Sequence, residues 1–100
     1  MTRVEMVRAF QNLGGGGFRQ ELLEEYCKVH YPSKFYSKEI QRRYLPSVEV
    51  DVTTHLAWLR REEFITRQMV KVEPKALSPP VLSHRHKPYY RLIRLYPSPS

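Results

Sequence analysis

The stretch from residue 52 to residue 67 constrains the fold most, because a helical pattern there leads directly into a strand. Val52, Leu56 and Leu59 recur at positions i, i+4 and i+7, so they form a single apolar stripe on a helix. The opposite face of that helix would carry short polar or small side chains and an arginine: Thr53, Thr54, Ala57 and Arg61. We therefore predict an amphipathic helix that packs on a small core and exposes a polar face.

The hydrophobic period changes from 3.6 to 2 after Phe64. Val70 and Val72 alternate with charged residues up to Pro74, which predicts a strand. A second β-rich run covers residues 89–96, and the segment between the two runs is rich in proline and basic residues, with no acid and no glycine. The sequence therefore predicts a hairpin with a long basic tip.

The first helix is indicated by a capping box formed by Thr2 and Glu5. Met6, Phe10 and Leu13 belong to its apolar stripe, and we predict that this stripe is a dimerisation surface on an added N-terminal helix over residues 2–13. All four glycines follow as one run at 14–17. The Lys-Ser or Lys-Thr of a phosphate loop is missing, so we interpret the run as a helix end and a hinge.

A second helix is predicted over residues 18–30, with a wide apolar face. A short third helix would begin at Ser37 and end at Pro46, and Lys38 and Arg42 would form a basic edge on it. The predicted order is helix, helix, short helix, helix, strand, long loop, strand. That order predicts an α+β (mainly α) fold, a winged helix-turn-helix with an extra N-terminal helix and a long β-hairpin wing.

The length of 100 residues fits one domain, with the winged-helix core at 18–96 and a tail at 97–100. With 41% hydrophobic and 27% charged residues, the composition is that of a globular protein. No apolar run approaches ~18 residues, so we expect a cytoplasmic protein without a membrane partner. The single cysteine, Cys27, cannot form an internal disulfide.

The basic charge is confined to one part of the chain. Residues 1–30 hold four basic and four acidic residues, so the formal net charge of +7 arises entirely from residues 31–100, with 13 basic and 6 acidic residues. A field of one sign attracts polyanions. Nucleic acid is the favoured partner, followed by an acidic protein or an anionic membrane surface.

Enzymatic chemistry finds little support in the sequence. The sole aspartate, Asp51, is interpreted as a helix cap, and Cys27 falls on the inner face of a helix. The pairs His84/His86 and Cys27/His30 are incomplete as zinc sites. We expect no catalysis, no metal, no cofactor and no small-molecule substrate.

The run from Val52 to Arg67 resembles the recognition-helix segment of winged-helix repressors of the ArsR type, which read approximately V-S-x-H-L-x-x-L-R and close with Y-Y-R-L. The matching residues here are Val52, Thr53, His55, Leu56, Leu59 and Arg60, followed by Phe64, Ile65 and the run Tyr89-Tyr90-Arg91-Leu92. The resemblance covers about residues 35–96. It implies a homodimer that binds double-stranded DNA with this helix in the major groove and the hairpin on the flanking backbone or minor groove.

Three features depart from that family. Glu62 and Glu63 stand where the family has a glycine turn, the wing is longer and lacks glycine, and the family's cysteine metal site has no counterpart. Metal sensing is therefore not carried over.

We predict a sequence-specific double-stranded DNA-binding transcriptional regulator, a homodimeric repressor. Thr54 and Arg61 would read the groove, while Glu49 and Asp51 near the helix start would oppose phosphate unless they cap the helix or accept from cytosine. The predicted DNA-binding residues are Thr53, Thr54, Ala57, Arg60, Arg61, Lys38, Arg42, Lys75, His84, Arg85 and Lys87. Two alternatives remain, an RNA-binding winged helix of the ribosome-associated kind and a protein-interaction winged helix in a transcription or replication assembly.

Overall fold

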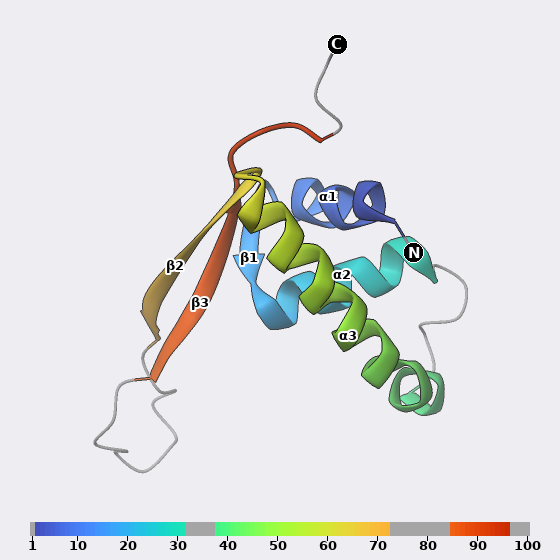
Figure 1. The fold of residues 1–100 in the computed structure, drawn as a ribbon. Helices are drawn as coiled ribbons and strands as arrows, with labels where there is room; N and C mark the ends of the chain where they lie inside the picture. The colour runs from blue at the N-terminus through green and yellow to red at the C-terminus, as the bar shows by residue number, and fades with distance from the viewer. Residues whose placement is uncertain (1, 32–37, 73–84, 97–100) are drawn as a thin grey trace.

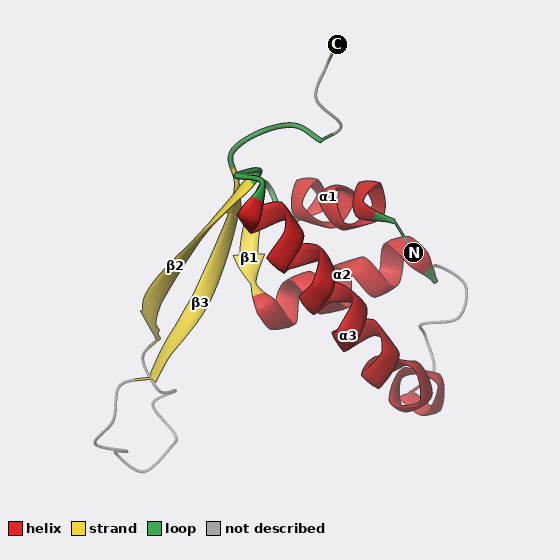
Figure 2. Ribbon diagram, viewed as in Figure 1, coloured by secondary structure: helices red, strands yellow, loops and turns green. Residues whose placement is uncertain are grey.

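Three helices and one three-stranded antiparallel sheet make up the computed structural model, which describes residues 2–31, 38–72 and 85–96 (Figures 1 and 2). The elements follow in the order α1 (Arg3–Asn12), β1 (Gly16–Phe18), α2 (Arg19–His30), α3 (Lys38–Arg61), β2 (Ile65–Val72) and β3 (Arg85–Leu92). The predicted α+β, mainly helical class is confirmed. No helix in these described ranges is both long enough and apolar enough to cross a membrane.

The sheet has the strand order β1-β3-β2, with β3 in the centre. β2 and β3 pair along their whole length, from Ile65 opposite Leu92 to Val72 opposite Arg85. β1 covers only the inner part of β3, because its last pair joins Phe18 to Tyr89. The β2–β3 hairpin therefore runs past the end of β1 and away from the helices (Figure 1).

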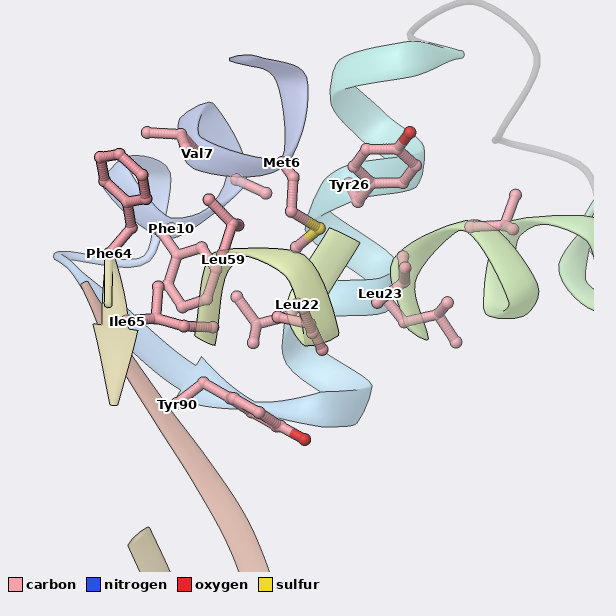
Figure 3. Packing of buried hydrophobic residues seen from close by; sticks show 14 of the residues in the cluster. Met6, Val7, Phe10, Leu22, Leu23, Tyr26, Leu59, Phe64, Ile65 and Tyr90 are labelled. Carbon is pink, nitrogen blue, oxygen red and sulfur yellow. The ribbon is translucent and has the colours of Figure 1, made fainter. Parts of the chain in front are cut away.

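One buried cluster joins α1, α2, α3 and the inner end of the sheet (Figure 3). Met6 and Phe10 are 0% exposed and lie in this cluster with Leu22 and Leu59, while Leu13 packs against it. The prediction that Met6, Phe10 and Leu13 form a dimer surface is wrong, because the chain's own core already covers these side chains.

The capping box at the start of α1 is confirmed. The backbone N–H of Thr2 donates to Oε1 of Glu5 at 2.8 Å, and the N–H of Glu5 donates to Oγ1 of Thr2 at 3.3 Å. At the other end of α1, Gly14 has φ 78°, and the N–H groups of Gly14 and Gly15 donate to the carbonyls of Gln11 and Phe10 at 3.0 and 2.7 Å. This is a Schellman helix end, which favours glycine at the left-handed position.

The second half of the glycine run is not a hinge, so that interpretation is wrong. Gly16 and Gly17 pair with β3 as part of β1. A Cβ atom on Gly16 would lie 2.8 Å from Oη of Tyr89 and 2.9 Å from the carbonyl oxygen of Tyr90. Glycine is needed there because β3 approaches the backbone closely.

The two helices predicted on either side of Pro46 are one helix of 24 residues, α3, so the predicted break is wrong. Proline removes one backbone N–H and crowds the preceding turn, which bends a helix without necessarily ending it. The first turns of α3 run in a different direction from the rest (Figure 1). The predicted cap residue Ser37 lies outside the described residues.

The turn between α3 and β2 contains the only non-glycine residue with positive φ among the described residues, Glu63 at 61°. The N–H of Glu63 donates to the carbonyl of Arg60 at 3.1 Å, and the N–H of Phe64 donates to that of Leu59 at 2.8 Å. These two bonds form a second Schellman end. The left-handed position at this helix end is therefore occupied by glutamate rather than glycine.

β3 begins at Arg85 and ends at Leu92, earlier than the predicted run of 89–96, and it contains Pro88. The N–H of Leu92 donates to Gly15 at 2.8 Å on the β1 side of the strand. Backbone N–H groups two residues apart on a strand point to the same side, so the position of Pro88 that lacks an N–H also faces the β1 side. β1 has already ended there, at the pair of Phe18 and Tyr89, so no hydrogen bond to β1 is lost. Proline is therefore tolerated in the central strand.

Candidate nucleic-acid interface

The outer face of α3 carries a stripe of small side chains that ends in an arginine. Val48, Val52 and Leu59 are buried against the core, which turns Val50, Thr54, Ala57 and Arg61 to the opposite side of the helix. All four are exposed, and Val50 is 68% exposed. We call these four residues the outer stripe. It contains no carboxylate.

The hydroxyl groups of the two threonines are already occupied. Oγ1 of Thr54 donates to the carbonyl oxygen of Val50 at 2.9 Å, and Oγ1 of Thr53 donates to that of Glu49 at 2.8 Å. The guanidinium of Arg19, at the start of α2, also donates to Oγ1 of Thr53. Thr53 is therefore held from the side of α2 and lies beside the outer stripe, whereas Thr54 lies on it.

Cations extend along α3 on both sides of the bend. Within the described residues none of them forms an ion pair, so their charge is presented to the solvent. Arg43 stands seven residues before Val50 and therefore about two turns along the helix. The exposed cations of α3 are Lys38, Arg42, Arg43, Arg60 and Arg61.

The hairpin adds cations on both of its faces. Arg67 is opposite Tyr90 and shares a face with Lys71, whereas Lys87 is opposite Val70 on the other face. All three cations are exposed, and so are His86 and Arg91. The hairpin thus presents positive charge whichever face approaches a polyanion.

A hollow of about 380 Å³ separates the hairpin from the helices. Val72, Lys87 and Pro88 line it on the hairpin, Arg19 lines it at the start of α2, and Glu49 lines it on α3. The hairpin and the helices therefore face each other across this hollow, with Lys87 on the hairpin, Arg19 and Glu21 on α2, and Glu49 on α3.

Most of the predicted DNA-binding residues have solvent-exposed side chains in the structure. Those on α3 and the hairpin whose side chains are described are all exposed: Thr53, Thr54, Ala57, Arg60, Arg61, Lys38, Arg42 and Lys87. Arg85 opens β3 opposite Val72, but its side chain is not among those described. Lys75 and His84 lie outside the described residues.

Asp51 faces the core side of α3, so its interpretation as a helix cap is wrong. The hydroxyl of Tyr26 donates to its Oδ2, and Nε2 of His55 lies 3.2 Å from the same oxygen. His55 is only 7% exposed. Burial, and to a lesser degree Arg3, lowers the pKa of His55 against the opposing effect of Asp51. Asp51 and His55 therefore join α3 to α2 and do not oppose a ligand on the outer stripe.

A second polar contact joins α1 to α2. Nδ1 of His30 lies 2.7 Å from Oε2 of Glu5. Burial acts to raise the pKa of Glu5, but hydrogen bonds from His30 and from the backbone of Thr2 outweigh it and lower the pKa. Cys27 is buried, and burial followed by Glu24 raises the pKa of its thiol to about 12, so the thiolate is disfavoured.

The described tyrosines are used inside the protein. Tyr26 and Tyr90 are buried, and Tyr31, Tyr44, Tyr89 and Tyr96 are partly buried. Several stack on each other or meet phenylalanine edge-on, such as Tyr31 with Tyr44 at 5.5 Å and Tyr89 with Phe18 at 5.2 Å between ring centroids. Among the described tyrosines no ring stands free as a stacking platform for single-stranded bases.

No family model, curated protein or solved structure matches this chain.

The sequence patterns missed three residues of this face. The predicted break at Pro46 places Val50 in a turn, so the sequence did not predict it as a helix residue. In the structure Val50 precedes Thr54 and Ala57 by four and seven residues on the same face of α3. Arg43 was missed because the sequence predicts it in a separate short helix before Pro46, whereas it belongs to α3. The contact of Arg19 with Thr53 depends on how α2 packs against α3, and sequence spacing carries no signal for it.

Proposed function

We propose that this chain is a winged-helix protein that binds double-stranded DNA as a sequence-specific transcriptional regulator. α2 and α3 would form the helix-turn-helix, and the β2–β3 hairpin would be the wing. The order of elements and the β1-β3-β2 sheet support this assignment. The resemblance of residues 52–67 and 89–92 to ArsR-type repressors adds to it.

The outer stripe of α3 is the observation on which the proposal depends. An α-helix with its side chains is about 10–12 Å across, and the major groove of B-DNA is about 12 Å wide. Small side chains such as Ala57 let the helix backbone approach the base edges, and the absence of a carboxylate on the stripe avoids repulsion from phosphate. Arg61 at the end of the stripe supplies a donor for a base or a phosphate.

The flanking cations would supply most of the affinity. Arg43 and Arg60 on α3 and Lys71 and Lys87 on the hairpin are exposed without ion pairs in the described part of the chain. Contacts of this kind release counterions, so each neutralised phosphate should add ~0.9 to the log-log slope of affinity against salt.

In this proposal the protein is a cytoplasmic homodimeric repressor that acts by covering a promoter, and it binds without catalysing a reaction. The dimer surface would lie outside the Met6, Phe10 and Leu13 stripe, since the core buries Met6 and Phe10 and contacts Leu13.

Binding to a random duplex, measured by fluorescence anisotropy at several salt concentrations, tests the proposal. Arg61→Ala should weaken binding and reduce the salt slope by ~0.9. Arg8→Ala is the matched control, because Arg8 is also an exposed helical arginine but lies on α1. Equal effects of the two variants, or no salt-sensitive binding by the wild type, would contradict the proposal.

Competition separates the alternatives. A duplex DNA binder is displaced from labelled duplex by DNA more readily than by RNA, whereas stronger displacement by RNA would favour an RNA-binding winged helix. A protein-interaction module would bind duplex weakly and would not distinguish Arg61→Ala from Arg8→Ala.

A further inference from the structure

The outer stripe of α3 is apolar from Val50 to Ala57 and ends in Arg61. Val50 is 68% exposed and lines an open hollow of about 370 Å³ on α3, beside Arg19 at the start of α2. Arg19, Pro46, Glu49, Thr53 and Thr54 complete the lining of this hollow. A valine at this position gains nothing from the protein's own core, so its apolar surface is available to a ligand.

The hydroxyl of Thr54 does not make this surface polar. Because Oγ1 donates to the carbonyl of Val50 at 2.9 Å, the hydroxyl is directed to the helix backbone and the methyl group is the free part of the side chain. Together with Val50 and Ala57, Thr54 therefore gives a surface of methyl groups. We call it the methyl surface.

We propose that the methyl surface recognises the C5-methyl groups of thymine in the major groove, an inference that rests on the DNA-binding function proposed above. The thymine methyl is the one apolar group that the bases of unmodified DNA present in that groove, and alanine and threonine methyls are suited to contact it. Val50 and Ala57 are seven residues apart, which is ~10 Å along a helix or about three base-pair steps of ~3.4 Å.

The positive charge beside the methyl surface favours DNA as its ligand over an apolar protein segment. Arg61 closes one end of the stripe, and Arg19 lies at the rim of the hollow beside Thr53. Glu49 also lines this hollow, so the positive charge at the stripe comes mainly from the exposed cations of α3. An apolar protein segment would not need cations around it, whereas a duplex has methyl groups deep in a groove with phosphates on both sides. Arg61 is therefore placed for a phosphate, and the methyl surface is placed for bases.

The test begins with duplexes selected from a random library by the full-length protein. The enriched site is then synthesised with single thymines replaced by deoxyuridine, which removes only the C5-methyl group. We expect at least one replacement to weaken wild-type binding by about four-fold, the affinity equivalent of one buried methyl group. Val50→Ala should bind the thymine site more weakly and lose most of its sensitivity to that replacement.

Two substitutions of Thr54 separate its methyl from its hydroxyl. Thr54→Ser keeps the bond to Val50 and removes the methyl, so binding should fall by about four-fold. Thr54→Val keeps the methyl and removes the hydroxyl, so affinity should be close to that of the wild type. Because the side chain of Thr54 is exposed, both variants should unfold at temperatures near that of the wild type.

The outcomes distinguish this inference from the proposed function. An enriched site without thymine, equal affinity for thymine and deoxyuridine duplexes, or stronger loss in Thr54→Val than in Thr54→Ser would overturn thymine recognition while duplex binding stands. Absence of any duplex binding would overturn both. A four-fold loss that Val50→Ala abolishes would support the contact directly.

Discussion

Replacement of Glu63 by glycine should stabilise the protein. Glu63 has φ 61° at the end of α3, where the two bonds to Arg60 and Leu59 fix the backbone. A left-handed conformation costs a residue with a Cβ atom about 1–2 kcal/mol. Glycine avoids this cost but loses about 0.5–1 kcal/mol through the greater freedom of the unfolded chain. The expected net gain is therefore about 0.5–1 kcal/mol.

Thermal unfolding followed by circular dichroism measures this gain. For a domain of this size, 1 kcal/mol corresponds to about 4–8 °C in Tm, so Glu63→Gly should raise Tm by about 2–8 °C. Glu63→Ala is the matched control, because it removes the same negative charge from the helix C-terminus but keeps the Cβ atom. The difference between the two variants isolates the backbone conformation. A Tm for Glu63→Gly no higher than that for Glu63→Ala would refute the reasoning.

Three further outcomes follow from buried contacts. Gly16→Ala should lower the free energy of unfolding in urea by about 1–3 kcal/mol, since its Cβ would lie 2.8 Å from Oη of Tyr89; an unchanged urea midpoint would contradict this close approach. Tyr26→Phe should cost about 1–3 kcal/mol, because Asp51 loses the hydrogen bond from Tyr26 and keeps only the contact with His55, and an unchanged urea midpoint would contradict a stabilising role for this bond. The lowered pKa of His55 means that the unfolded chain binds its proton more readily, so this contribution to stability is present above pH 6.5 and is lost as the pH falls through the folded-state pKa. Tm measured against pH should therefore decline below pH 6.5 less steeply in His55→Gln than in the wild type, and parallel curves would contradict the assignment.

Local patterns in the sequence correctly predicted the start of the first helix, the buried stripe of α3 and the change from helix to strand after Phe64. The Thr2–Glu5 capping box forms as expected, and the apolar stripe of Val52, Leu56 and Leu59 is buried. Both depend on neighbours within one or two helical turns, so the spacing of residues carries the information.

Features that depend on tertiary packing were missed. Pro46 lies inside α3, where a bend replaces the predicted break. Met6 and Phe10 form an apolar stripe that reads equally well as a core face or a dimer face, and only the packing of α2 and α3 distinguishes the two. Asp51 has its donor in Tyr26, 25 residues away along the chain, so no local motif could place its carboxylate.

The central claim is that the outer stripe of α3 enters the major groove of DNA. Adding one carboxylate to this stripe and measuring the affinity for duplex DNA tests the claim most directly. Thr54→Glu places that charge at the centre of the stripe, and Gln11→Glu adds the same charge at an exposed position of α1. If α3 enters the major groove, Thr54→Glu should lose at least about ten-fold in affinity, equivalent to 1.4 kcal/mol, while Gln11→Glu stays close to the wild type. Equal affinities of the two variants would contradict the placement of α3 against DNA.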